Sequence, residues 1–332
     1  MPVCLVTGGA GFIGSHLVDA LVVRGYDVRV LDNFSTGKLD NLAWVRNQVE
    51  IIEGDVANPE DARRAVQGAE VVFHQAALAS VPRSIADPMA THQACATGTL
   101  TMLVAARDAK VRRFVYAGSS SAYGNSPLMP RRETQPTSPR SPYAIAKLAG
   151  EQYSEVFSQV YGLETVRLRY FNVFGPRQAP GSPYSAVIPL FIDAMLNGRN
   201  PVVQGDGLQS RDFTYVEDVV QANLLAAEAP RVAGQVYNIA CGRRTTLLQL
   251  IDAVNDILGT RVKPLYQEPR VGDVRHSEAD ISRAQTDLGY CPRWDLKQGL
   301  ARCVEYYAAF CKPAEHKNGH NTLASFSPTS PI

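Results

Sequence analysis

The stretch TGGAGFIG, residues 7–14, decides the fold of this chain. It lies between an apolar run at Val3–Val6 and a helical pattern that extends from about Phe12 to Arg24. Its spaced glycines allow a tight turn, a close approach of backbone to a pyrophosphate, and close packing of helix against strand. A second apolar run ends at Asp32, where a carboxylate accepts hydrogen bonds from a ribose and repels a 2′-phosphate. The pattern predicts a dinucleotide-binding turn that favours NAD over NADP.

Strand-like runs and helical patterns alternate over the first half of the chain. Apolar runs recur at 49–52, 70–74, 114–117 and 165–168, and helical patterns separate them at 59–66, 89–108 and 143–161. Two further segments, 219–227 and 236–239, indicate a helix and a strand that return to the sheet. This alternation predicts an α/β fold with a doubly wound parallel sheet of the Rossmann type. The ligand is then expected along the carboxyl ends of the strands.

The rhythm changes after Gly175-Pro176, where prolines become frequent. We therefore expect residues 1–175, with 216–241 returning to them, to form an NAD-binding domain. Residues 176–215 and 242–311 are expected to form a smaller α/β substrate-binding lobe, with the ligand in the cleft between the two units. The polar segment 313–332 has no periodicity and is expected to be a flexible tail.

The composition disfavours several classes of partner. The formal net charge of the 332 residues is +1, so no basic face is indicated and nucleic acid is not an expected partner. No run of about 18 apolar residues is present, and the N-terminus begins directly on a strand, so neither a membrane span nor a signal peptide is expected. The six cysteines are scattered, which is typical of reduced thiols in a cytoplasmic protein. No metal site is expected.

A second informative segment is SPYAIAK, residues 141–147. Ser141 is suited to an N-cap and Pro142 to a first helical turn, which places Tyr143 and Lys147 one turn apart on the same helix face. A free phenol is a poor base at neutral pH because its pKa is about 10, but a nearby ammonium can lower that pKa. Oxidation of an alcohol by a nicotinamide needs such a base.

The serines at 119–121 follow the apolar run 114–117 and can supply a hydroxyl for the same reaction. Taken alone, a Tyr-x-x-x-Lys spacing is typical of an ordinary amphipathic helix. Here the dinucleotide turn, the serine run and the Tyr143/Lys147 pair occur in the order and at the sheet positions that nicotinamide chemistry requires. Together they predict a nicotinamide-dependent enzyme.

Longer motifs extend this interpretation over about residues 3–310. They are HQAALASVPRS (74–84), SSSAYG (119–124), LRYFNVFGPRQ (168–178), YSAVIP (184–189), GDGLQSRDFTYVEDV (205–219) and RVGDVRHSEADIS (270–282). With TGGAGFIG and the Tyr143/Lys147 pair, these motifs resemble the extended short-chain dehydrogenase/reductases. More narrowly, they resemble UDP-hexose 4-epimerases, and most of all the branch that acts on N-acetylated sugars. The resemblance implies inversion at C4 of UDP-GlcNAc/UDP-GalNAc, and also of UDP-Glc/UDP-Gal, through a transient 4-keto sugar.

The resemblance also implies NAD as the cofactor and assigns the catalytic residues. Tyr143 is the base, Lys147 lowers its pKa and binds the ribose, and Ser119 contacts the sugar oxygen, with Ser120 or Ser121 as alternatives for that hydroxyl. Asp55 and Val56 would hold the adenine, and Phe171 would touch the nicotinamide. The expected cofactor-binding residues are Gly8, Gly11, Phe12, Ile13, Gly14, Asp32, Asn33, Phe34, Ser35, Thr36, Gly37, Asp55, Val56, Gln75, Ala76, Ala77, Tyr143, Lys147 and Phe171.

The same resemblance implies a UDP-sugar site. Its expected residues are Ser84, Ser120, Ser121, Asn172, Ala186, Val187, Val202, Gln204, Arg211, Arg270, Asp273 and Ser277. Arg211 and Arg270 would clamp the diphosphate, because a guanidinium binds phosphate oxygens in a bidentate manner. Ser277 matches the position whose bulk limits the sugar pocket, so a small residue there implies room for a 2-acetamido group.

Two features distinguish this chain within the family that it resembles. Related 4,6-dehydratases carry acidic residues after the catalytic hydroxyl, which eliminate water. Ser120 and Ser121 cannot catalyse that elimination, so a dehydratase is not expected. Cys95 stands where the family usually has an asparagine, and a thiol is a much weaker hydrogen-bond partner, so a difference in substrate positioning is expected. For the thiol itself, inert packing is expected rather than a reactive role.

Several alternatives stay open at this point. They are a UDP-glucuronate 4-epimerase or decarboxylase, a nucleotide-sugar reductase, and an NAD-binding regulator without turnover. The resemblance further implies a homodimer, formed by the helices expected at 89–108 and 143–161.

Overall fold

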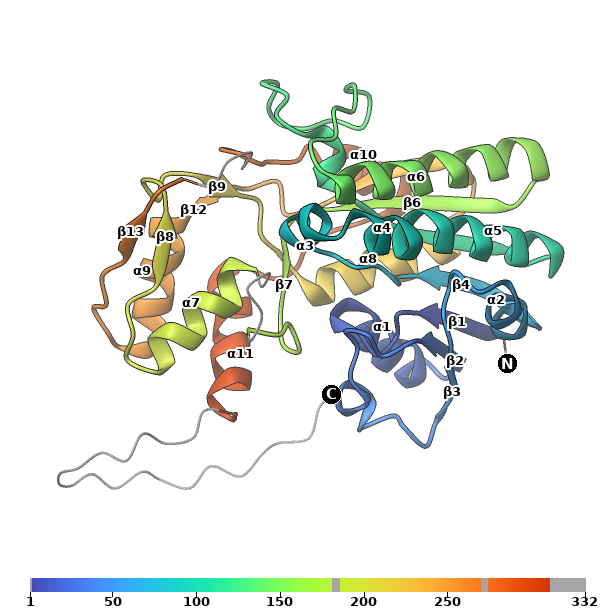
Figure 1. Ribbon diagram of the computed structural model, residues 1–332, viewed down its shortest axis with the longest axis horizontal. Coiled ribbons are helices and arrows are strands. Elements are labelled where there is room, and N and C mark those ends of the chain that lie inside the picture. Colours follow the sequence, from blue (N-terminus) through green and yellow to red (C-terminus); the bar gives the residue numbers. More distant parts are fainter. Residues whose placement is uncertain (1, 181–185, 270–273, 311–332) are drawn as a thin grey trace.

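The structure, a computed structural model, describes residues 2–180, 186–269 and 274–310. Its centre is a seven-stranded sheet in which every neighbouring pair of strands is parallel. The strands are β1 (Val3–Thr7), β2 (Asp27–Asp32), β3 (Val49–Glu53), β4 (Ala69–His74), β5 (Arg113–Ser119), β6 (Glu164–Tyr170) and β11 (Gln235–Ile239). Their order in the sheet, β11-β6-β5-β4-β1-β2-β3, is the doubly wound arrangement (Figure 1). The predicted fold class is confirmed.

Helices cover both faces of this sheet (Figure 1). One face carries α2 (Pro59–Val66), α5 (Gly98–Asp108) and α6 (Pro142–Tyr161), and the other carries α1 (Phe12–Val23), α8 (Val216–Glu228) and α10 (Ser282–Leu288). Alternate strand residues point to opposite faces. In β1, Leu5 therefore packs in the core beneath α2, α5 and α6, while Cys4 and Val6 pack in the core beneath α1, α8 and α10. Because both faces are covered, most strand residues are buried, and the strands appear in the sequence as short apolar runs. β6 is a partial exception, because it also buries Arg167 and Arg169.

The helix that carries the Tyr143/Lys147 pair begins and ends where the sequence indicates. The Ser141 hydroxyl accepts a hydrogen bond from Ala144 N at 3.1 Å, and Pro142 occupies the first turn. Gly162 ends α6 in the left-handed conformation, with φ 71°. The observed bounds differ from the predicted segment 143–161 by one residue.

The predicted helix at 89–108 is interrupted. It consists of α4 (Pro88–His92), a π-helical turn at Gln93–Thr97, and α5. The Thr99 hydroxyl donates a hydrogen bond to the carbonyl oxygen of Cys95 at 2.6 Å, so a side chain takes part in bonding this turn. A Cβ on Gly98 would lie 2.6 Å from Cγ2 of Val56, so the helix passes close to the loop after β3. Such π-turns occur frequently at functional sites.

The smaller lobe is built around three helices, α7 (Val187–Leu196), α9 (Leu247–Leu258) and α11 (Leu296–Ala308). They share a core that includes Phe191, Ile251 and Leu300. Short strand pairs accompany them: β8 (Val202–Gln204) with β13 (Leu265–Gln267), β9 (Ser210–Arg211) with β12 (Thr245–Thr246), and β7 (Val173–Phe174) with β10 (Thr214–Tyr215). Figure 1 shows this lobe beside the sheet.

Part of the segment that the sequence assigns to the smaller lobe packs on the central sheet instead. The sequence pattern assigns the whole of 242–311 to the smaller lobe, but Ala279, Ile281, Ala284, Leu288 and Tyr290 pack into the core of the sheet. The reason is that α10 lies against α8 and β11, so this segment belongs to the larger unit. The expected tail at 313–332 lies outside the described residues.

The described residues contain neither a membrane-spanning helix nor a disulfide. No helix in these ranges combines the length and the apolar character that a bilayer crossing needs. The five cysteines that the structure describes all carry free thiols. Nor do three or more His, Cys, Asp or Glu side chains of this part of the chain gather in a way that could hold a metal ion.

Candidate active site

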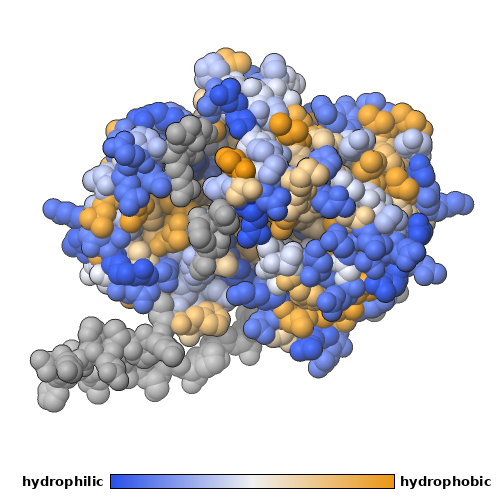
Figure 2. Space-filling model, viewed as in Figure 1, coloured by the Kyte–Doolittle hydropathy of each residue, from blue (hydrophilic) through white to orange (hydrophobic). Residues whose placement is uncertain are grey.

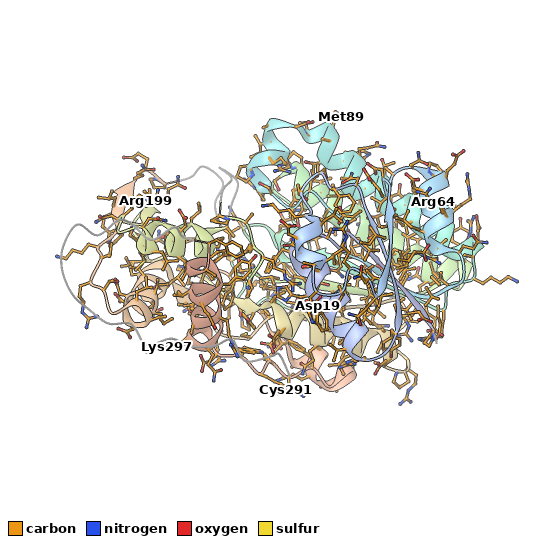
Figure 3. All side chains as sticks on the ribbon, turned by 90° about the horizontal axis from the view of Figure 1, so that it is seen from below. Asp19, Arg64, Met89, Arg199, Cys291 and Lys297 are labelled. Carbon is orange, nitrogen blue, oxygen red and sulfur yellow. The ribbon has the colours of Figure 1, made fainter. Side chains whose placement is uncertain are left out.

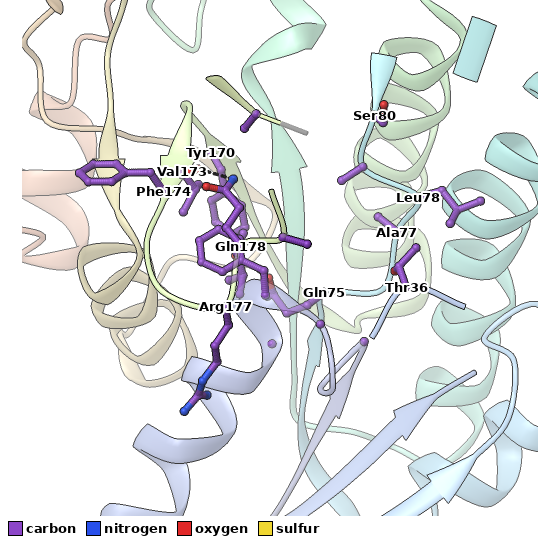
Figure 4. A pocket seen from close by; sticks show the side chains of 18 of the residues that line it. Thr36, Gln75, Ala77, Leu78, Ser80, Tyr170, Val173, Phe174, Arg177 and Gln178 are labelled. Carbon is purple, nitrogen blue, oxygen red and sulfur yellow. Dashed lines mark hydrogen bonds between the residues drawn. The ribbon is translucent and has the colours of Figure 1, made fainter. Parts of the chain in front are cut away.

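A cavity of about 1930 Å³ opens where the carboxyl ends of the sheet strands face the smaller lobe. Its wall comes from the turn after β1, from the segments after β2, β4 and β5, and from the chain that follows β6. Figure 4 shows two of these segments, with residues 75–80 across the cavity from residues 173–178. Open α/β sheets bind ligands at this edge, so the cavity is the candidate active site.

The turn at residues 8–14 has no room for a side chain at Gly8 or Gly14. Gly8 has φ 66°, and a Cβ on Gly14 would lie 2.1 Å from the carbonyl oxygen of Gly8. Helix α1 begins after Gly11, and no side chain caps its first amides. A glycine turn that leads into an uncapped helix start is suited to a pyrophosphate. This cradle therefore fits the predicted NAD.

Asp32 lies at the carboxyl end of β2 and lines the cavity. Its carboxylate accepts hydrogen bonds from the backbone amides of Ala10 and Phe34, both at 2.9 Å. Burial raises the pKa of Asp32, and these two hydrogen bonds oppose the shift. A carboxylate at this place can accept hydrogen bonds from a ribose and would disfavour a phosphate, and this role of Asp32 stays a prediction.

All of the expected cofactor-binding residues line the cavity except Phe34 and Lys147. The side chain of Phe34 packs against the core on the α1 side of the sheet, and its backbone amide donates a hydrogen bond to Asp32. Lys147 is buried within α6. The other residues expected to hold the cofactor therefore line one cavity, from Asp55 and Val56 to Phe171, and their individual roles stay predictions.

Tyr143 and Ser119 lie on the same wall of the cavity. Burial raises the pKa of Tyr143 above its ordinary value, and a hydrogen bond with Ser119 opposes this rise. The expected low pKa is therefore not a property of the structure, because the apolar neighbours of the phenol, which include Ala77 and Ala146, penalise a phenolate. The Oγ atoms of Ser119 and Ser121 lie 2.8 Å apart, so two of the three candidate hydroxyls act as a pair.

The ammonium group of Lys147 lies 4.7 Å from the centre of the Tyr116 ring. Burial lowers the pKa of Lys147, whereas the negative face of the Tyr116 ring stabilises the protonated ammonium. Lys147 and Tyr143 are one turn apart on α6, as the spacing predicts. The roles of Lys147 as ribose ligand and pKa-lowering partner stay predictions.

The expected substrate residues fall into three groups. Ser84 is buried away from the cavity, and its hydroxyl donates to Val81 O at 2.7 Å within α3 (Val81–Ala86). Arg270 and Asp273 lie outside the described residues, so the second half of the arginine clamp stays a prediction. The residues that line the cavity are Ser120, Ser121, Asn172, Ala186, Val187, Val202, Gln204, Arg211 and Ser277.

A buried carboxylate joins the segments that carry these residues. Asp212 Oδ1 accepts a hydrogen bond from Cys241 N at 3.0 Å, and Oδ2 accepts one from Ala279 N at 3.1 Å. The carbonyl oxygen of Asp212 accepts a hydrogen bond from Asn172 Nδ2 at 3.3 Å. Burial raises the pKa of Asp212 to about 7, against the opposing effect of its backbone donors. These bonds fix Arg211, the preceding residue, relative to Asn172.

The sequence matches the NAD dependent epimerase/dehydratase family over residues 4–240. This chain belongs to that family. A UDP-N-acetylglucosamine 4-epimerase from Methanobrevibacter ruminantium, solved with UDP-N-acetylmuramic acid, is 40% identical, with a TM-score of 0.89 over 93% of this chain and 99% of that one. A UDP-glucose 4-epimerase from Thermotoga maritima, solved with UDP-glucose, is 41% identical, with the same TM-score and coverage. A UDP-glucose 4-epimerase from Mycolicibacterium smegmatis is 38% identical over 91% of this chain and 97% of that protein.

These likenesses confirm three expectations. The cofactor is NAD, the fold is that of the extended short-chain dehydrogenase/reductases, and the chain is an enzyme of the epimerase type within this family. The seven-stranded sheet and its strand order agree with this assignment. The choice of sugar is not settled by family membership, because an epimerase of UDP-N-acetylglucosamine and one of UDP-glucose are about equally similar to the chain.

Sequence reasoning missed several residues that line the cavity of this family member. Arg83, Arg177 and Gln178 lie within motifs quoted above, so their place in those motifs was the available signal. Tyr306 and Tyr307 come from α11. Nothing in their local sequence marks them, because only the tertiary fold brings α11 to the cleft.

The segment Pro176–Gln178, which we call the strap, ties α1 to the smaller lobe. His16 Nε2 donates to Pro176 O at 3.0 Å, and Arg177 Nη2 donates to Asp19 Oδ2 at 2.6 Å. Figure 3 shows Asp19 on α1 near the middle of the molecule. On the other side, the carbonyl oxygen of Gln178 accepts a hydrogen bond from α11 at 2.5 Å. The strap therefore fixes both walls of the cavity near the dinucleotide turn.

His16 makes this contact sensitive to pH. Burial, together with the nearby Arg177 guanidinium, lowers the pKa of His16 from 6.5 to about 4. A group with a lowered pKa in the folded state contributes stability that is present above its unfolded pKa of 6.5 and is lost as the pH falls through 4. We expect this group alone to lower the free energy of unfolding by up to about 3 kcal/mol on acidification.

Urea unfolding of the wild type and of His16→Gln, measured between pH 7 and pH 4, checks this expectation. Glutamine keeps an N–H donor for Pro176 O but does not titrate. The variant should lose less stability on acidification than the wild type does. Equal losses in the two proteins would contradict the assignment of this pH dependence to His16.

Proposed function

We propose that this enzyme inverts C4 of a UDP-hexose, with UDP-GlcNAc/UDP-GalNAc as the main pair and UDP-Glc/UDP-Gal as a second pair. The observation that carries the proposal is one continuous cavity. It runs from the glycine turn, past Tyr143 and Ser119, to Arg211 and Ser277. A dinucleotide site, a candidate base and a candidate sugar pocket therefore share one cavity, which is the arrangement that an internal oxidation and reduction requires.

NAD, when bound, supplies a nicotinamide carbon that accepts a hydride from C4 of the sugar and later returns it. Tyr143 takes the proton of the C4 hydroxyl, and the Ser119 hydroxyl holds the same oxygen by a hydrogen bond. The 4-keto sugar then turns within the cavity, and Tyr143 returns the proton to the oxygen on C4. Because the hydride and the proton are both returned, the reaction has no net redox change.

Because the pKa of Tyr143 is raised in the structure, binding of the cofactor must lower it before Tyr143 can act as a base. Burial favours the neutral phenol in the structure. A positive charge close to the phenol favours the phenolate and lowers its pKa. Lys147 on the same helix, and the positive ring of an oxidised nicotinamide, are the cations that would stand beside it. We therefore expect Tyr143 to become a base only when the cofactor site is filled.

Turning of the sugar requires a firm anchor and a loose pocket. Arg211 and Asn172 line the part of the cavity that would hold the diphosphate, and the Asp212 hydrogen bonds fix them relative to each other. The expected sugar end is lined by small side chains, among them Ser120 and Ser277. Tight contacts at the diphosphate and few at the sugar let the sugar present either face to the cofactor.

Ser277 sets the size of the sugar that the site admits. It lines the cavity, and its backbone amide donates to Ser210 O at 3.0 Å, which fixes its position. We expect Ser277→Tyr to lower kcat/KM for UDP-GlcNAc by about 100-fold, and kcat/KM for UDP-Glc by no more than about threefold, because the ring fills the space of the 2-acetamido group. Steady-state rates with each sugar nucleotide measure the two effects.

Ser277→Ala is the matched control, because it removes the hydroxyl without adding bulk. It should leave the ratio of the two kcat/KM values near that of the wild type. If Ser277→Tyr lowers the rates for the two sugars equally, Ser277 does not limit the sugar pocket, and the preference for acetylated sugars has another source.

One observation favours a UDP-glucuronate as a second candidate substrate. Arg131 is buried and lines the cavity, and its guanidinium donates to the carbonyl oxygens of Leu128, at 2.9 Å, and Gly124, at 3.5 Å. Both of these partners are neutral, and a carboxylate on the sugar would pair with such a cation. Only a comparison of substrates decides between an acidic and a neutral sugar.

The purified protein should be incubated with UDP-GlcNAc, UDP-Glc and UDP-GlcA in separate reactions without added cofactor, and the anomeric signals followed by NMR. Conversion to the C4 epimer without accumulation of NADH supports the proposal, and the fastest of the three reactions names the sugar. Loss of carbon dioxide would indicate a decarboxylase, and a need for stoichiometric NAD(P)H would indicate a reductase. Absence of turnover on all three, with NAD bound, would indicate a regulator.

We also propose that the enzyme is a homodimer joined through α5 and α6. Helix α6 exposes a set of large apolar side chains: Ile145, Tyr153, Val156, Val160 and Tyr161. Figure 2 shows apolar patches on this side of the molecule. Clustered apolar side chains on a surface helix favour an interface between proteins. Sedimentation that gives the mass of a single chain would contradict the dimer.

A further inference from the structure

A chain of buried hydrogen bonds runs from the cofactor site to the π-helical turn. Ala76 N lies 3.3 Å from Thr7 Oγ1, and Thr7 Oγ1 lies 2.8 Å from His74 Nδ1. On the other side of the ring, His74 Nε2 lies 3.0 Å from Thr99 Oγ1, which lies 2.6 Å from Cys95 O. His74 and both threonines are fully buried. Ala76 lines the cavity, and Cys95 lies in the turn that interrupts the helix.

Each hydrogen in this chain has one possible direction. The carbonyl oxygen of Cys95 can only accept, so the Thr99 hydroxyl donates its hydrogen there and must accept from His74 Nε2–H. The amide of Ala76 can only donate, to Thr7 Oγ1. With its ring hydrogen on Nε2, His74 accepts at Nδ1 from the Thr7 hydroxyl. The imidazole is therefore neutral and present as a single tautomer.

The environment of the ring agrees with this assignment. Burial and the positive charge of Lys147 lower the pKa of His74 to about 3. A protonated ring would place hydrogens on both nitrogens, and the Thr7 hydroxyl would then have to accept from the ring as well as from Ala76. The neutral ring satisfies every donor and acceptor along the path, which is the condition for a stable buried network.

The same ring contacts the helix that carries the catalytic pair. His74 stacks on Tyr116, with ring centres 6.0 Å apart and planes at 21°. The Tyr116 hydroxyl donates to the carbonyl oxygen of Lys147 at 2.9 Å, and the Lys147 ammonium lies over the Tyr116 ring. The π-turn places Cys95 in a small cluster against Tyr143. The buried hydrogen-bond network therefore contacts α6 in two places, through Tyr116 and through the π-helical turn.

We propose that His74, held between Thr7 and Thr99 as the neutral Nε2–H tautomer, is a positioning residue that sets the depth of Tyr143 and Lys147 against the cofactor. This inference rests on the proposed function for its kinetic consequences, but not for the tautomer. The link from Thr99 to the Cys95 carbonyl holds the π-turn. Without it, the turn can relax to a regular helix, which moves Cys95 and the α6 face that packs on it.

Thr99→Val tests this inference, because valine has nearly the same shape but neither accepts from His74 nor donates to Cys95 O. We expect kcat for C4 inversion to fall by about 10- to 100-fold, since small displacements of reacting groups are costly. KM should change by no more than about twofold, because binding depends on the distant diphosphate anchor. Thr99→Ser restores both hydrogen bonds and should return kcat to within about threefold of the wild type.

Thr165→Val is the matched control. Thr165 is also fully buried, and its hydroxyl donates to the α6 carbonyl oxygen of Ser154 at 2.6 Å, but it is not part of the chain. It should lower thermal stability as Thr99→Val does, while leaving kcat near the wild-type value. If Thr99→Val and Thr165→Val lose kcat equally, the Thr99 hydrogen bonds contribute only to stability, and the proposal is overturned.

The tautomer can be read without any substrate. In ¹⁵N-histidine-labelled wild type, the signals that are missing from His74→Gln should be those of a neutral ring with hydrogen on Nε2, at pH 6 and at pH 8. An Nδ1–H tautomer or an imidazolium would overturn the assignment even if the variants fail to fold. If the wild type shows no C4 inversion, the proposed function fails while this readout still judges the network.

Discussion

Tyr143→Phe should lower kcat for C4 inversion by about 10²- to 10⁴-fold, the range that general acid–base catalysis contributes. The substitution removes only the phenolic oxygen from a side chain that already lies in the cavity wall beside Ser119. Hydride transfer from C4 leaves a protonated carbonyl unless a base takes the hydroxyl proton, and Tyr143 is the group to which we assign that role. The NAD content of the purified variant should stay at the wild-type level, because the glycine turn is untouched.

Tyr266→Phe is the control for this prediction. Tyr266 lies in β13, is exposed to solvent and does not line the cavity, so loss of its hydroxyl should leave kcat unchanged. The anomeric NMR signals give the rate, and absorbance after acid release gives the NAD content. Turnover by Tyr143→Phe at the parental rate would remove Tyr143 from its proposed role.

The environment of the Tyr143/Lys147 pair is not visible in the sequence. In the structure, burial raises the pKa of Tyr143, and the sequence alone gives no indication of this shift. A helical i, i+4 spacing indicates only that Tyr143 and Lys147 share a face. It does not show that the Lys147 ammonium rests on Tyr116, since that contact depends on β5, whose position relative to α6 is set by tertiary packing.

The parts of the fold that sequence predicts well are those in which local pattern and tertiary role coincide. The glycines of residues 8–14 are required where backbone atoms meet, so the turn is visible in the sequence. The strands are buried on both faces and appear as apolar runs. Ser141 and Gly162 mark the ends of α6, because capping depends on local backbone geometry.

The parts that sequence predicts poorly depend on contacts between distant segments. The helical pattern at 89–108 contains no sign of the π-turn, whose carbonyl oxygen at Cys95 is bonded by Thr99 and, beyond it, by His74. The return of residues 279–290 to the sheet core is equally hidden, because α10 has an ordinary helical pattern and only its packing against α8 assigns it to the larger unit. Ser84 shows the same limit, since the motif predicts a ligand but α3 turns the hydroxyl to Val81 O.

Gly14→Ala should abolish NAD binding and destabilise the protein. A Cβ at this position would lie 2.1 Å from the carbonyl oxygen of Gly8 and 2.9 Å from Cα of Gly9, and backbone on both sides cannot move away without opening the turn. Overpacking of this kind costs about 1–3 kcal/mol, and each kcal/mol lowers Tm by about 2–4 °C in proteins of 150–250 residues, and by less in a chain of 332.

We expect purified Gly14→Ala to carry less than about a tenth of the wild-type NAD, because the pyrophosphate needs both the close approach of backbone and the first amides of α1. Gly68→Ala is the control: Gly68 has φ 70° with nothing near its Cβ direction, so alanine there adds backbone strain without a clash. That variant should lose some thermal stability and keep its full NAD content. Wild-type NAD content in Gly14→Ala would show that the turn does not hold the cofactor in the way its glycines indicate.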